Sequence, residues 1–211
     1  MIVLIADDHS SITFAATHLA EQVMAADDRH EVGIASDVDQ LLQQLAQVGN
    51  EPCLLVLDLN MPGEFKRLGL IREVLQVAPN ARIVVYSASE SPLLVEAALK
   101  LGIFGYVSKR ASLPRLKAAM KAVMAGKTYV DPGIDLEAAQ GHPWKALTPA
   151  EREVLIALAK GQNLRELAEE SGRAYTTVTN HKYAAMSKLD LPNGDIYGWL
   201  ATAGLTFLLD P

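Results

Sequence analysis

Short continuous apolar runs alternate, over the first 130 residues, with longer stretches that place an apolar side chain at every third or fourth position. A short apolar run between turn residues is typical of a strand buried on both faces of a parallel sheet, and the longer spacing is typical of a helix that buries one side. Five strand–helix units in succession predict a doubly wound, flavodoxin-like α/β domain with a five-stranded parallel sheet. The strands are expected at residues 2–6, 31–35, 53–57, 82–86 and 105–108, and the helices are expected to begin near residues 11, 38, 66, 92 and 112.

The pattern changes after residue 130. Proline and glycine punctuate both ends of residues 131–146, with little periodicity between them, which predicts a linker. Residues 147–211 then contain four amphipathic stretches without a strand pattern, so we expect a second, all-α domain of four helices.

The starts of these helices carry capping signals. Thr148 and Glu151 form a capping box with a proline between them, and Asn163 opens the second helix in the same way. A short turn containing glycine leads into a third helix at about 175–189, and a fourth is expected near 195–203. Helix, short turn and helix is the helix-turn-helix pattern of DNA-binding proteins.

Composition narrows the class of protein. Half of the 211 residues are apolar, which suffices for buried cores, yet no apolar run reaches the ~18 residues that a membrane span needs. The chain starts without the basic segment and cleavage site of a signal peptide, and its single cysteine, Cys53, lies in a predicted buried strand. We therefore expect a cytoplasmic protein with no membrane contact. The net charge of −6 means that any nucleic-acid contact must use a local patch.

Polar side chains stand where the predicted strands end. The first strand is followed by Asp7 and Asp8, the third by Asp58, the fourth by Ser87 and the fifth by Lys109. Chemistry in an open parallel sheet gathers outside the carboxyl ends of its strands, so we expect these five side chains to meet. Three carboxylates attract a hard divalent cation such as Mg²⁺, and a lysine can pair with a phosphoryl oxygen. The pattern predicts a Mg²⁺ site that accepts a phosphoryl group on Asp58.

An acid pair, a lone aspartate, a hydroxyl and a lysine, each closing a strand in this order, resemble the receiver domain of bacterial two-component response regulators. The resemblance covers residues 1 to about 130 and implies phosphorylation of Asp58. It implies that Ser87 and Lys109 contact the phosphoryl group and that Tyr106, on the last strand, reorients. The implied Mg²⁺ ligands are Asp7, Asp8, Asp58 and the backbone carbonyl of Asn60.

Two residues near this constellation have competing interpretations. His9 follows the acid pair and is a candidate metal ligand, but hard cations prefer oxygen, so we favour a solvated or capping histidine. Tyr106 is a candidate for simple core packing, as most strand aromatics are. Its position three residues before Lys109 matches the receiver family and favours a switch role.

The second domain has a resemblance of its own. Its Leu-Thr-Pro-Ala-Glu-Arg-Glu-Val-Leu start at residues 147–155, with Gly161, Thr177-Val178, His181 and Lys188-Leu189, resembles the output domain of NarL/FixJ (LuxR-type) regulators. In that family the third helix enters the major groove of DNA and the fourth supports dimerisation. The implied DNA-binding residues are Thr177, Thr179, Asn180, His181, Lys182 and Tyr183, with His181 and Lys182 near the phosphate backbone. The implied dimerisation residues are Ile196, Trp199, Leu200 and Ala203.

Several positions depart from the family pattern. Thr179 stands where the family usually has a basic residue, Ser171 and Arg173 fill apolar positions, and Ala174 is a poor N-cap. Residues 147–211 contain six Lys and Arg but eight acids, whereas a domain that neutralises many phosphates is normally basic.

Together, these features predict a transcriptional regulator. A sensor histidine kinase, or a small phosphodonor, phosphorylates it on Asp58, and it binds promoter DNA through helix 175–189 as a homodimer. One alternative is a phosphorylation-gated adaptor whose second domain binds protein. Another is a DNA-binding protein that needs no phosphorylation. The sequence contains no glycine-rich nucleotide loop, zinc spacing or Ser/His/Asp set, so we expect no enzyme that turns over an external metabolite.

Overall fold

The computed structural model describes residues 1–24, 31–191 and 194–210. Contacts divide the chain into two compact units, residues 1–135 and residues 136–210. The predicted linker is shared between them: residues 131–135 belong to the first unit and residues 136–146 to the second.

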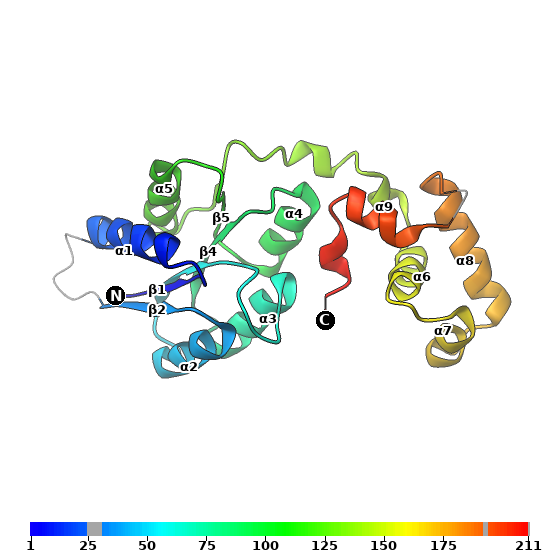
Figure 1. The fold of residues 1–211 in the computed structure, drawn as a ribbon, viewed down its shortest axis with the longest axis horizontal. Coiled ribbons are helices and arrows are strands. Elements are labelled where there is room, and N and C mark those ends of the chain that lie inside the picture. The colour runs from blue at the N-terminus through cyan, green and yellow to red at the C-terminus, as the bar shows by residue number, and fades with distance from the viewer. Residues whose placement is uncertain (25–30, 192–193, 211) are drawn as a thin grey trace. The chain divides into compact units, whose positions relative to one another are not determined.

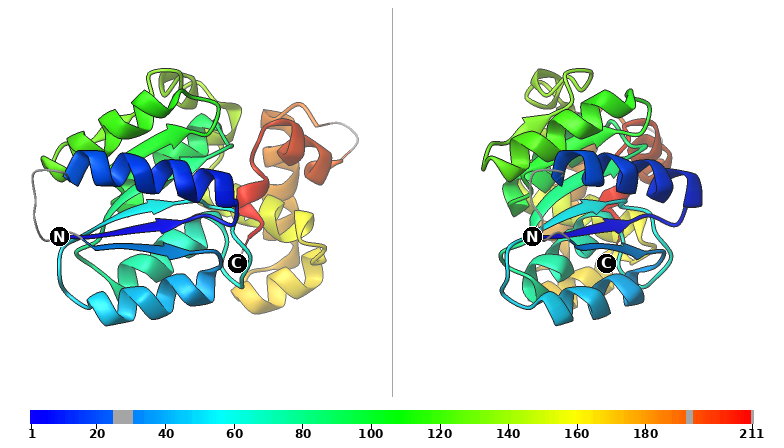
Figure 2. Two further views of the ribbon diagram at one scale, coloured as in Figure 1. Left: turned by 60° about the vertical axis from the view of Figure 1, so that its left-hand side comes forward. Right: turned by 90° about the vertical axis from the view of Figure 1, so that its left-hand side faces the viewer.

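The first unit is a parallel sheet with helices on both faces (Figure 1). Across the sheet the order is β2-β1-β3-β4-β5-β6, with β1 at Ile2–Ala6, β2 at Glu31–Ala35, β3 at Cys53–Leu57, β4 at Arg82–Ser87, β5 at Gly105–Ser108 and β6 at Tyr129–Val130. The helices are α1 (Ser10–Met24), α2 (Val38–Val48), α3 (Arg67–Val77), α4 (Pro92–Leu101) and α5 (Leu113–Met124). α1 and α5 pack together on one face, and α2, α3 and α4 cover the other (Figure 2). The predicted doubly wound fold is confirmed.

The strand count differs from the prediction. A sixth strand, β6, pairs in parallel with β5, with Gly105 opposite Tyr129 and Tyr106 opposite Val130. Two residues are too short to form a periodic pattern, and this pair lies between Gly126 and the Asp131-Pro132-Gly133 turn. Within the described residues the sheet therefore has six strands and not five, and it extends to the edge of the predicted linker.

Alternation within the strands builds the core. Val3 and Ile5 of β1 face α1 and α5 together with Leu54 and Val56 of β3, and all four are almost fully buried. Every residue of β3 is buried, as expected for a strand covered on both faces. Burying side chains of this size stabilises the fold by about 1.5–3 kcal/mol each. This core holds the strand ends, and the side chains that follow them, in fixed positions.

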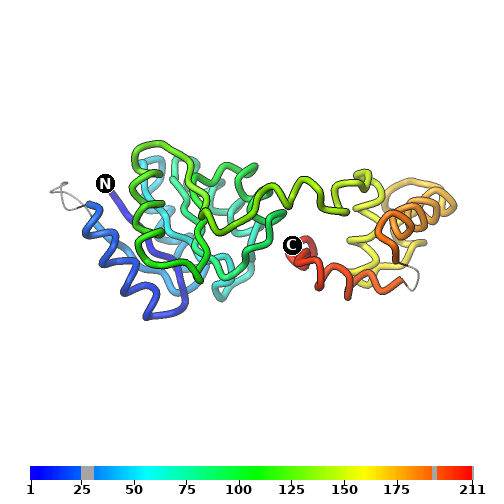
Figure 3. The backbone as a smooth tube through the Cα atoms, turned by 90° about the horizontal axis from the view of Figure 1, so that it is seen from above, coloured from blue at the N-terminus to red at the C-terminus, as the bar shows by residue number. Residues whose placement is uncertain are grey.

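The second unit contains the four predicted helices, α6 (Pro149–Ala159), α7 (Leu164–Ser171), α8 (Tyr175–Lys188) and α9 (Ile196–Thr202), whose backbone runs from yellow to red in Figure 3. Short 3₁₀ helices η1 (Glu137–Ala139) and η2 (Pro143–Ala146) precede them, and η3 (Thr206–Leu208) follows. Both predicted capping boxes are present, Thr148 with Glu151 and Asn163 with Glu166. Gly172, with a φ of 64°, closes α7 in the left-handed conformation that the turn between α7 and α8 requires.

Two further expectations concern single features. Cys53 is 1% exposed in β3, and burial raises the pKa of its thiol. Among the described residues, none of the helices combines the length and apolar character needed to cross a lipid bilayer.

Candidate functional site

Neighbouring strands bring Asp7 and Asp58 together. β1 and β3 pair in parallel with Ala6 opposite Leu57, so the residues that follow the two strands leave the sheet at the same edge. The Asp58 N–H donates to the Ala6 carbonyl over 2.8 Å, which ties the two strand ends together. Both aspartates are buried, each 3% exposed. Two carboxylates this close in a buried place require a cation.

Lys109 provides that cation. It follows β5, and its Nζ lies 2.7 Å from Asp7 Oδ2 and 2.9 Å from Asp58 Oδ2. Burial by itself lowers the pKa of Lys109, but hydrogen bonds and charges from Asp7 and Asp58 outweigh it, so the pKa is raised. The lysine is therefore protonated at neutral pH, and it neutralises part of the charge of the acid pair.

The acids also have the arrangement of a divalent-cation site. Asp7, Asp8, His9 and Asp58 each offer one ligand atom, and these atoms all lie within 4.8 Å of one another. Three carboxylates fit Mg²⁺, which prefers oxygen ligands. The His9 side chain is 64% exposed, and its Nδ1 lies 2.8 Å from Asp8 Oδ1 and 3.2 Å from Asp7 Oδ1. His9 is thus a solvated hydrogen-bond partner of the acid pair.

A cleft of about 290 Å³ gives access to this group of residues. Its lining includes Asp8, Asp58, Asn60, Ala88 and Lys109. The Asn60 N–H donates to Asp58 Oδ1 over 3.3 Å, so the chain curls around the carboxylate just after β3. A small polar group can therefore reach Asp58 although most of the residue is buried.

Ser87 and Tyr106 are connected through the loop that follows β4. Ser87 is fully buried, and its hydroxyl accepts the Ser89 N–H over 3.3 Å. Tyr106 is also fully buried, and its hydroxyl donates to the Ser89 carbonyl over 2.8 Å. Burial raises the pKa of Tyr106 to about 12. Tyr106 is thus a core residue that also holds the β4–α4 loop.

The residues expected to bind DNA do not share one face of α8. Thr177, Asn180 and Tyr183 are exposed, and Tyr183 is 60% exposed. His181 and Lys182 are half-buried, and Lys182 Nζ lies 5.1 Å from the centre of the Tyr183 ring.

Thr179 differs from the expectation for a groove-facing residue. Thr179 as a whole is half-buried, and its hydroxyl oxygen is buried without a hydrogen-bond partner in the described part of the chain. In a helix whose buried residues include Val178 and Ala185, position 179 borders the inner face. The hydroxyl therefore does not point outward toward a ligand in this structure.

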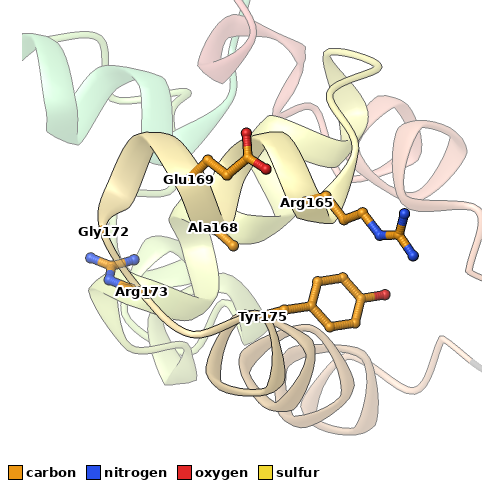
Figure 4. Close-up of a pocket in the computed structure, with 6 residues that line it drawn as sticks. All are labelled: Arg165, Ala168, Glu169, Gly172, Arg173 and Tyr175. Atoms are coloured by element: carbon orange, nitrogen blue, oxygen red, sulfur yellow. The ribbon is translucent and has the colours of Figure 1, made fainter.

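A pocket of about 490 Å³ lies at the turn between α7 and α8, and the sequence reasoning did not identify it. Arg165 of α7 and Tyr175 of α8 extend to the same side of it (Figure 4), and Ala168, Glu169, Gly172 and Arg173 complete the lining. Arg173 pairs with Glu153 over 2.8 Å, whereas Arg165 has no carboxylate partner among the described residues. The sequence contains one signal for this pocket: Arg165 comes two residues after Asn163, the N-cap residue of α7.

The apolar stripe of α9 is buried only in part. Ile196, 7% exposed, and Leu200, 0% exposed, are buried where α9 packs against α6. Trp199 stacks on Trp144 with ring centres 6.2 Å apart, and Ala203 is half-buried. Ile196 and Leu200 therefore support the unit's own core, whereas Trp199 and Ala203 remain partly exposed, and the role of α9 in dimerisation stays a prediction. A hydrophobic stripe shows that one helix face is covered, but it does not show by what.

Two protein families match the chain. Residues 3–121 match the response regulator receiver domain, and residues 145–194 match the luxR family of bacterial regulatory proteins. The two matches correspond to the two units and to the two resemblances seen in the sequence.

Several regulatory proteins are similar to this chain over nearly its whole length. The transcriptional regulatory protein RcsB of Escherichia coli K12 is 32% identical over 199 residues, covering 92% of this chain and 90% of that protein. The oxygen regulatory protein NreC of Staphylococcus carnosus is 28% identical, with 90% and 92% covered. A structure of RcsB from Salmonella enterica serovar Typhimurium, bound to promoter rprA with the phosphomimetic BeF₃⁻, has a TM-score of 0.65 and 28% identity, with 99% and 98% covered.

Proposed function

The chain belongs to the NarL/FixJ family of two-component response regulators, and we propose that it controls transcription through phosphorylation of Asp58. The observation that carries the proposal is the ion pair of Lys109 with both Asp7 and Asp58, at the base of a cleft open to solvent. When two buried carboxylates share one lysine, a charge added to one carboxylate changes how the lysine pairs with both.

The phosphoryl transfer is a displacement at phosphorus. An Asp58 carboxylate oxygen attacks the phosphorus of a phosphohistidine on a sensor kinase, or of a small acyl phosphate. The new O–P bond forms as the bond to the imidazole nitrogen or acyl oxygen breaks, and the leaving group keeps that electron pair. When bound, Mg²⁺ would be held by Asp7, Asp8, Asp58 and the Asn60 carbonyl, and it would supply positive charge against the phosphoryl oxygens.

The residues around Asp58 respond to the added charge. A phosphoryl group brings roughly −1.5 to −2 charges, so Lys109 moves from the Asp58 oxygen to a phosphoryl oxygen, and the Ser87 hydroxyl donates to another. Ser87 lies two residues before Ser89, whose carbonyl accepts the Tyr106 hydroxyl. Because Tyr106 is already buried, its response is a change in this hydrogen bond and not a swing from solvent into the core.

The second unit then binds promoter DNA as part of a homodimer. α8 supplies Asn180 and Thr177 for base edges and Tyr183 for apolar contact, because these side chains are exposed on it. Lys182 and His181 lie close to the phosphate backbone. Arg165, in the pocket at the turn, is a further phosphate contact that the sequence reasoning missed. The relatives do not favour the alternative of a protein-binding adaptor.

The phosphorylation test uses Mg²⁺ and acetyl phosphate as the phosphodonor. Wild-type protein and an Asp39→Ala control, altered at an exposed position in the first turn of α2, are expected to be labelled. Asp58→Ala is expected to remain unlabelled and folded, and removal of Mg²⁺ is expected to prevent labelling of the wild type and of Asp39→Ala. Labelling of Asp58→Ala at the wild-type level would reject the assignment.

The DNA test separates the second unit from the first. Asn180→Ala is expected to weaken specific DNA binding by about 1–3 kcal/mol, the range for one base contact, and to leave labelling of Asp58 unchanged. Thr202→Ala, at an exposed position of α9, serves as the control and should bind DNA as the wild type does. Equal affinity of Asn180→Ala and wild type would show that α8 is oriented differently on DNA.

A further inference from the structure

Asp131 is a buried carboxylate outside the phosphoacceptor site. It follows β6 directly, at the start of the segment 131–135 through which the chain leaves the first unit, and it is 1% exposed. Residue 131 lies in the segment that the sequence predicts to be a linker, which gives no sign of burial, so its burial needs an explanation. A buried charge is retained at a cost in solvation unless it is paired and hydrogen-bonded.

Every oxygen of Asp131 has a partner. Oδ1 accepts from Nη1 of Arg115 in α5 and from the Gly133 N–H over 2.9 Å. Oδ2 accepts from the Ser108 N–H over 3.3 Å. The backbone of Asp131 is tied to the same strand, because its N–H donates to the Tyr106 carbonyl over 2.8 Å. One residue thus connects α5, β5 and the exit segment.

The strand that Asp131 holds is the one that ends at the phosphoacceptor site. Ser108 directly precedes Lys109, whose Nζ bonds both Asp7 and Asp58. The Ser108 hydroxyl donates to Glu90 of the β4–α4 loop over 2.5 Å. Ser108 therefore bonds the exit segment through its N–H and the β4–α4 loop through its side chain, while its neighbour bonds the site.

We propose that Asp131 and Arg115 are positioning residues that couple the phosphorylation state of Asp58 to the segment 131–135. This proposal rests on the proposed function and names its route of regulation. When Lys109 shifts toward a phosphoryl oxygen, the backbone at Ser108 shifts with it. The Ser108 N–H then displaces the Asp131 carboxylate, which also accepts the Gly133 N–H. The Arg115 guanidinium fixes the other oxygen, so the displacement acts on the exit segment.

The spacing around Gly133 shows how closely this group is packed. A Cβ added to Gly133 would lie 3.2 Å from Arg115 Nη1 and 3.4 Å from Asp131 Oδ1. Gly133→Ala therefore pushes on the ion pair without removing a charge, and Asp131→Asn removes the charge with little change of shape. Two variants that perturb the pair by different routes make the proposal testable even if one of them folds poorly.

The direct test follows amide hydrogen exchange of the full chain with Mg²⁺, with and without acetyl phosphate. In the wild type, phosphorylation is expected to change exchange at the amides of Ser108 and Gly133. In Asp131→Asn and Gly133→Ala, labelling of Asp58 is expected to stay at the wild-type level while the phosphorylation-dependent change at Gly133 is lost. Asp39→Asn, the same chemical change at an exposed site, is the matched control and should behave as the wild type.

The second measurement is the ratio of DNA affinities of phosphorylated and unphosphorylated protein. Coupling between two sites usually amounts to roughly 5- to 150-fold, and we expect Asp131→Asn and Arg115→Gln to bring the wild-type ratio close to 1. The double variant should have no further effect, because both changes break one connection.

Wild-type coupling in Asp131→Asn, with normal labelling, would overturn the proposal, and so would equal loss in Asp39→Asn. The proposal would also be overturned if amide exchange at Gly133 of the wild type did not change on phosphorylation, even if DNA binding depended on phosphorylation of Asp58. A wild type that changes exchange at Gly133 but binds DNA equally in both states would instead reject the proposed function.

Discussion

At the scale of single residues, the chemistry of this protein depends on one lysine placed between two buried aspartates. Lys109 bonds Asp7 over 2.7 Å and Asp58 over 2.9 Å, and its side chain is only 15% exposed. An ion pair of this kind contributes little net stability, but removing one partner leaves unpaired buried charge. The lysine is therefore replaceable only by another cation.

We predict that Lys109→Met lowers the free energy of unfolding by about 3 kcal/mol at neutral pH, in the range for a broken buried pair. Mg²⁺ should restore more stability to this variant than to the wild type, because the cation neutralises the carboxylates that Lys109 no longer pairs. Thermal unfolding with and without Mg²⁺ measures both effects. Lys100→Met, on the exposed side of α4, is the control and should show neither.

Tyr106 gives a second prediction at this scale. Burial raises its pKa from 10.0 to about 12, so the unfolded chain loses the phenolic proton before the folded chain does. Tyr106 should therefore favour folding below pH 10, and this contribution should be lost as the pH rises toward 12. Absorbance titration should show one tyrosine that ionises near pH 12, and this step should be missing in Tyr106→Phe. A titration of Tyr106→Phe that retains the late step would contradict the assignment.

At the scale of elements, the helices of the second unit differ in how their first turns are satisfied. α6 begins with the capping box of Thr148 and Glu151, whereas the N-cap of α8 is Ala174, which offers no side-chain hydrogen bond. Glu151 is also bound by Lys188, the last residue of α8, with Nζ 2.8 Å from Oε2. Residues at the start of α6 thus hold the end of α8 in place, while the first turn of α8 has no side-chain cap.

We predict that Ala174→Ser stabilises the second unit by about 1 kcal/mol, because serine can accept an N–H from the first turn of α8. Ala174 already has an extended backbone, with φ −63° and ψ 139°, so serine fits without rearrangement. Ala184→Ser, in the exposed middle of α8, should instead lower the stability slightly. Denaturant unfolding of both variants measures the free energy of unfolding. Equal free energies for the two variants would show that the cap position does not limit the stability of the second unit.

The pair of Glu151 and Lys188 should make the stability depend on pH. Hydrogen bonding to Lys188 lowers the pKa of Glu151 below its ordinary value of 4.5. The pair therefore stabilises the folded state above about pH 4.5, and it loses this contribution as the pH falls through the lowered pKa. Glu151→Gln keeps a side chain that can complete the capping box but carries no charge. Its deficit relative to wild type should be present at pH 7 and disappear in acid.

At the scale of the whole molecule, the net charge of −6 limits how the protein holds DNA. Arg173 and Lys188 are engaged by Glu153 and Glu151, so they add little to a positive surface. Arg165 and Lys182 have no carboxylate partner in the described part of the chain. DNA contact must therefore rely on few phosphates and on the exposed side chains of α8.

We predict that the logarithm of DNA affinity falls with the logarithm of salt concentration with a slope of roughly −2 per bound copy, from phosphate contacts of Arg165 and Lys182 at about −0.9 each. Lys182→Ala should reduce this slope by about 1 per copy and weaken binding to all sequences alike. Binding titrations at several salt concentrations measure both. Affinity that does not change with salt would favour a second unit that binds protein.

The sequence by itself determined the elements, the order of the chemistry along the chain and the fold class. Burial on both faces left continuous apolar runs in β1, β3 and β4, and the capping residues Thr148 and Asn163 marked helix starts by local hydrogen bonds. Because parallel strands end at one edge of a sheet, the residues after them were expected to meet, and the structure brings Asp7, Asp58 and Lys109 together.

Only the tertiary structure decided what each buried group lies against. Sequence periodicity reports that a face is covered, but the covering partner comes from residues far away in the chain. For this reason the stripe of Ile196 and Leu200 proved to pack on α6, and the two residues of β6 became visible only beside β5. Nothing in the sequence indicated that Asp131 is buried, because its partners, Arg115 and Ser108, lie 16 and 23 positions earlier. Contacts at such separation leave no local signal, so folding alone defines them.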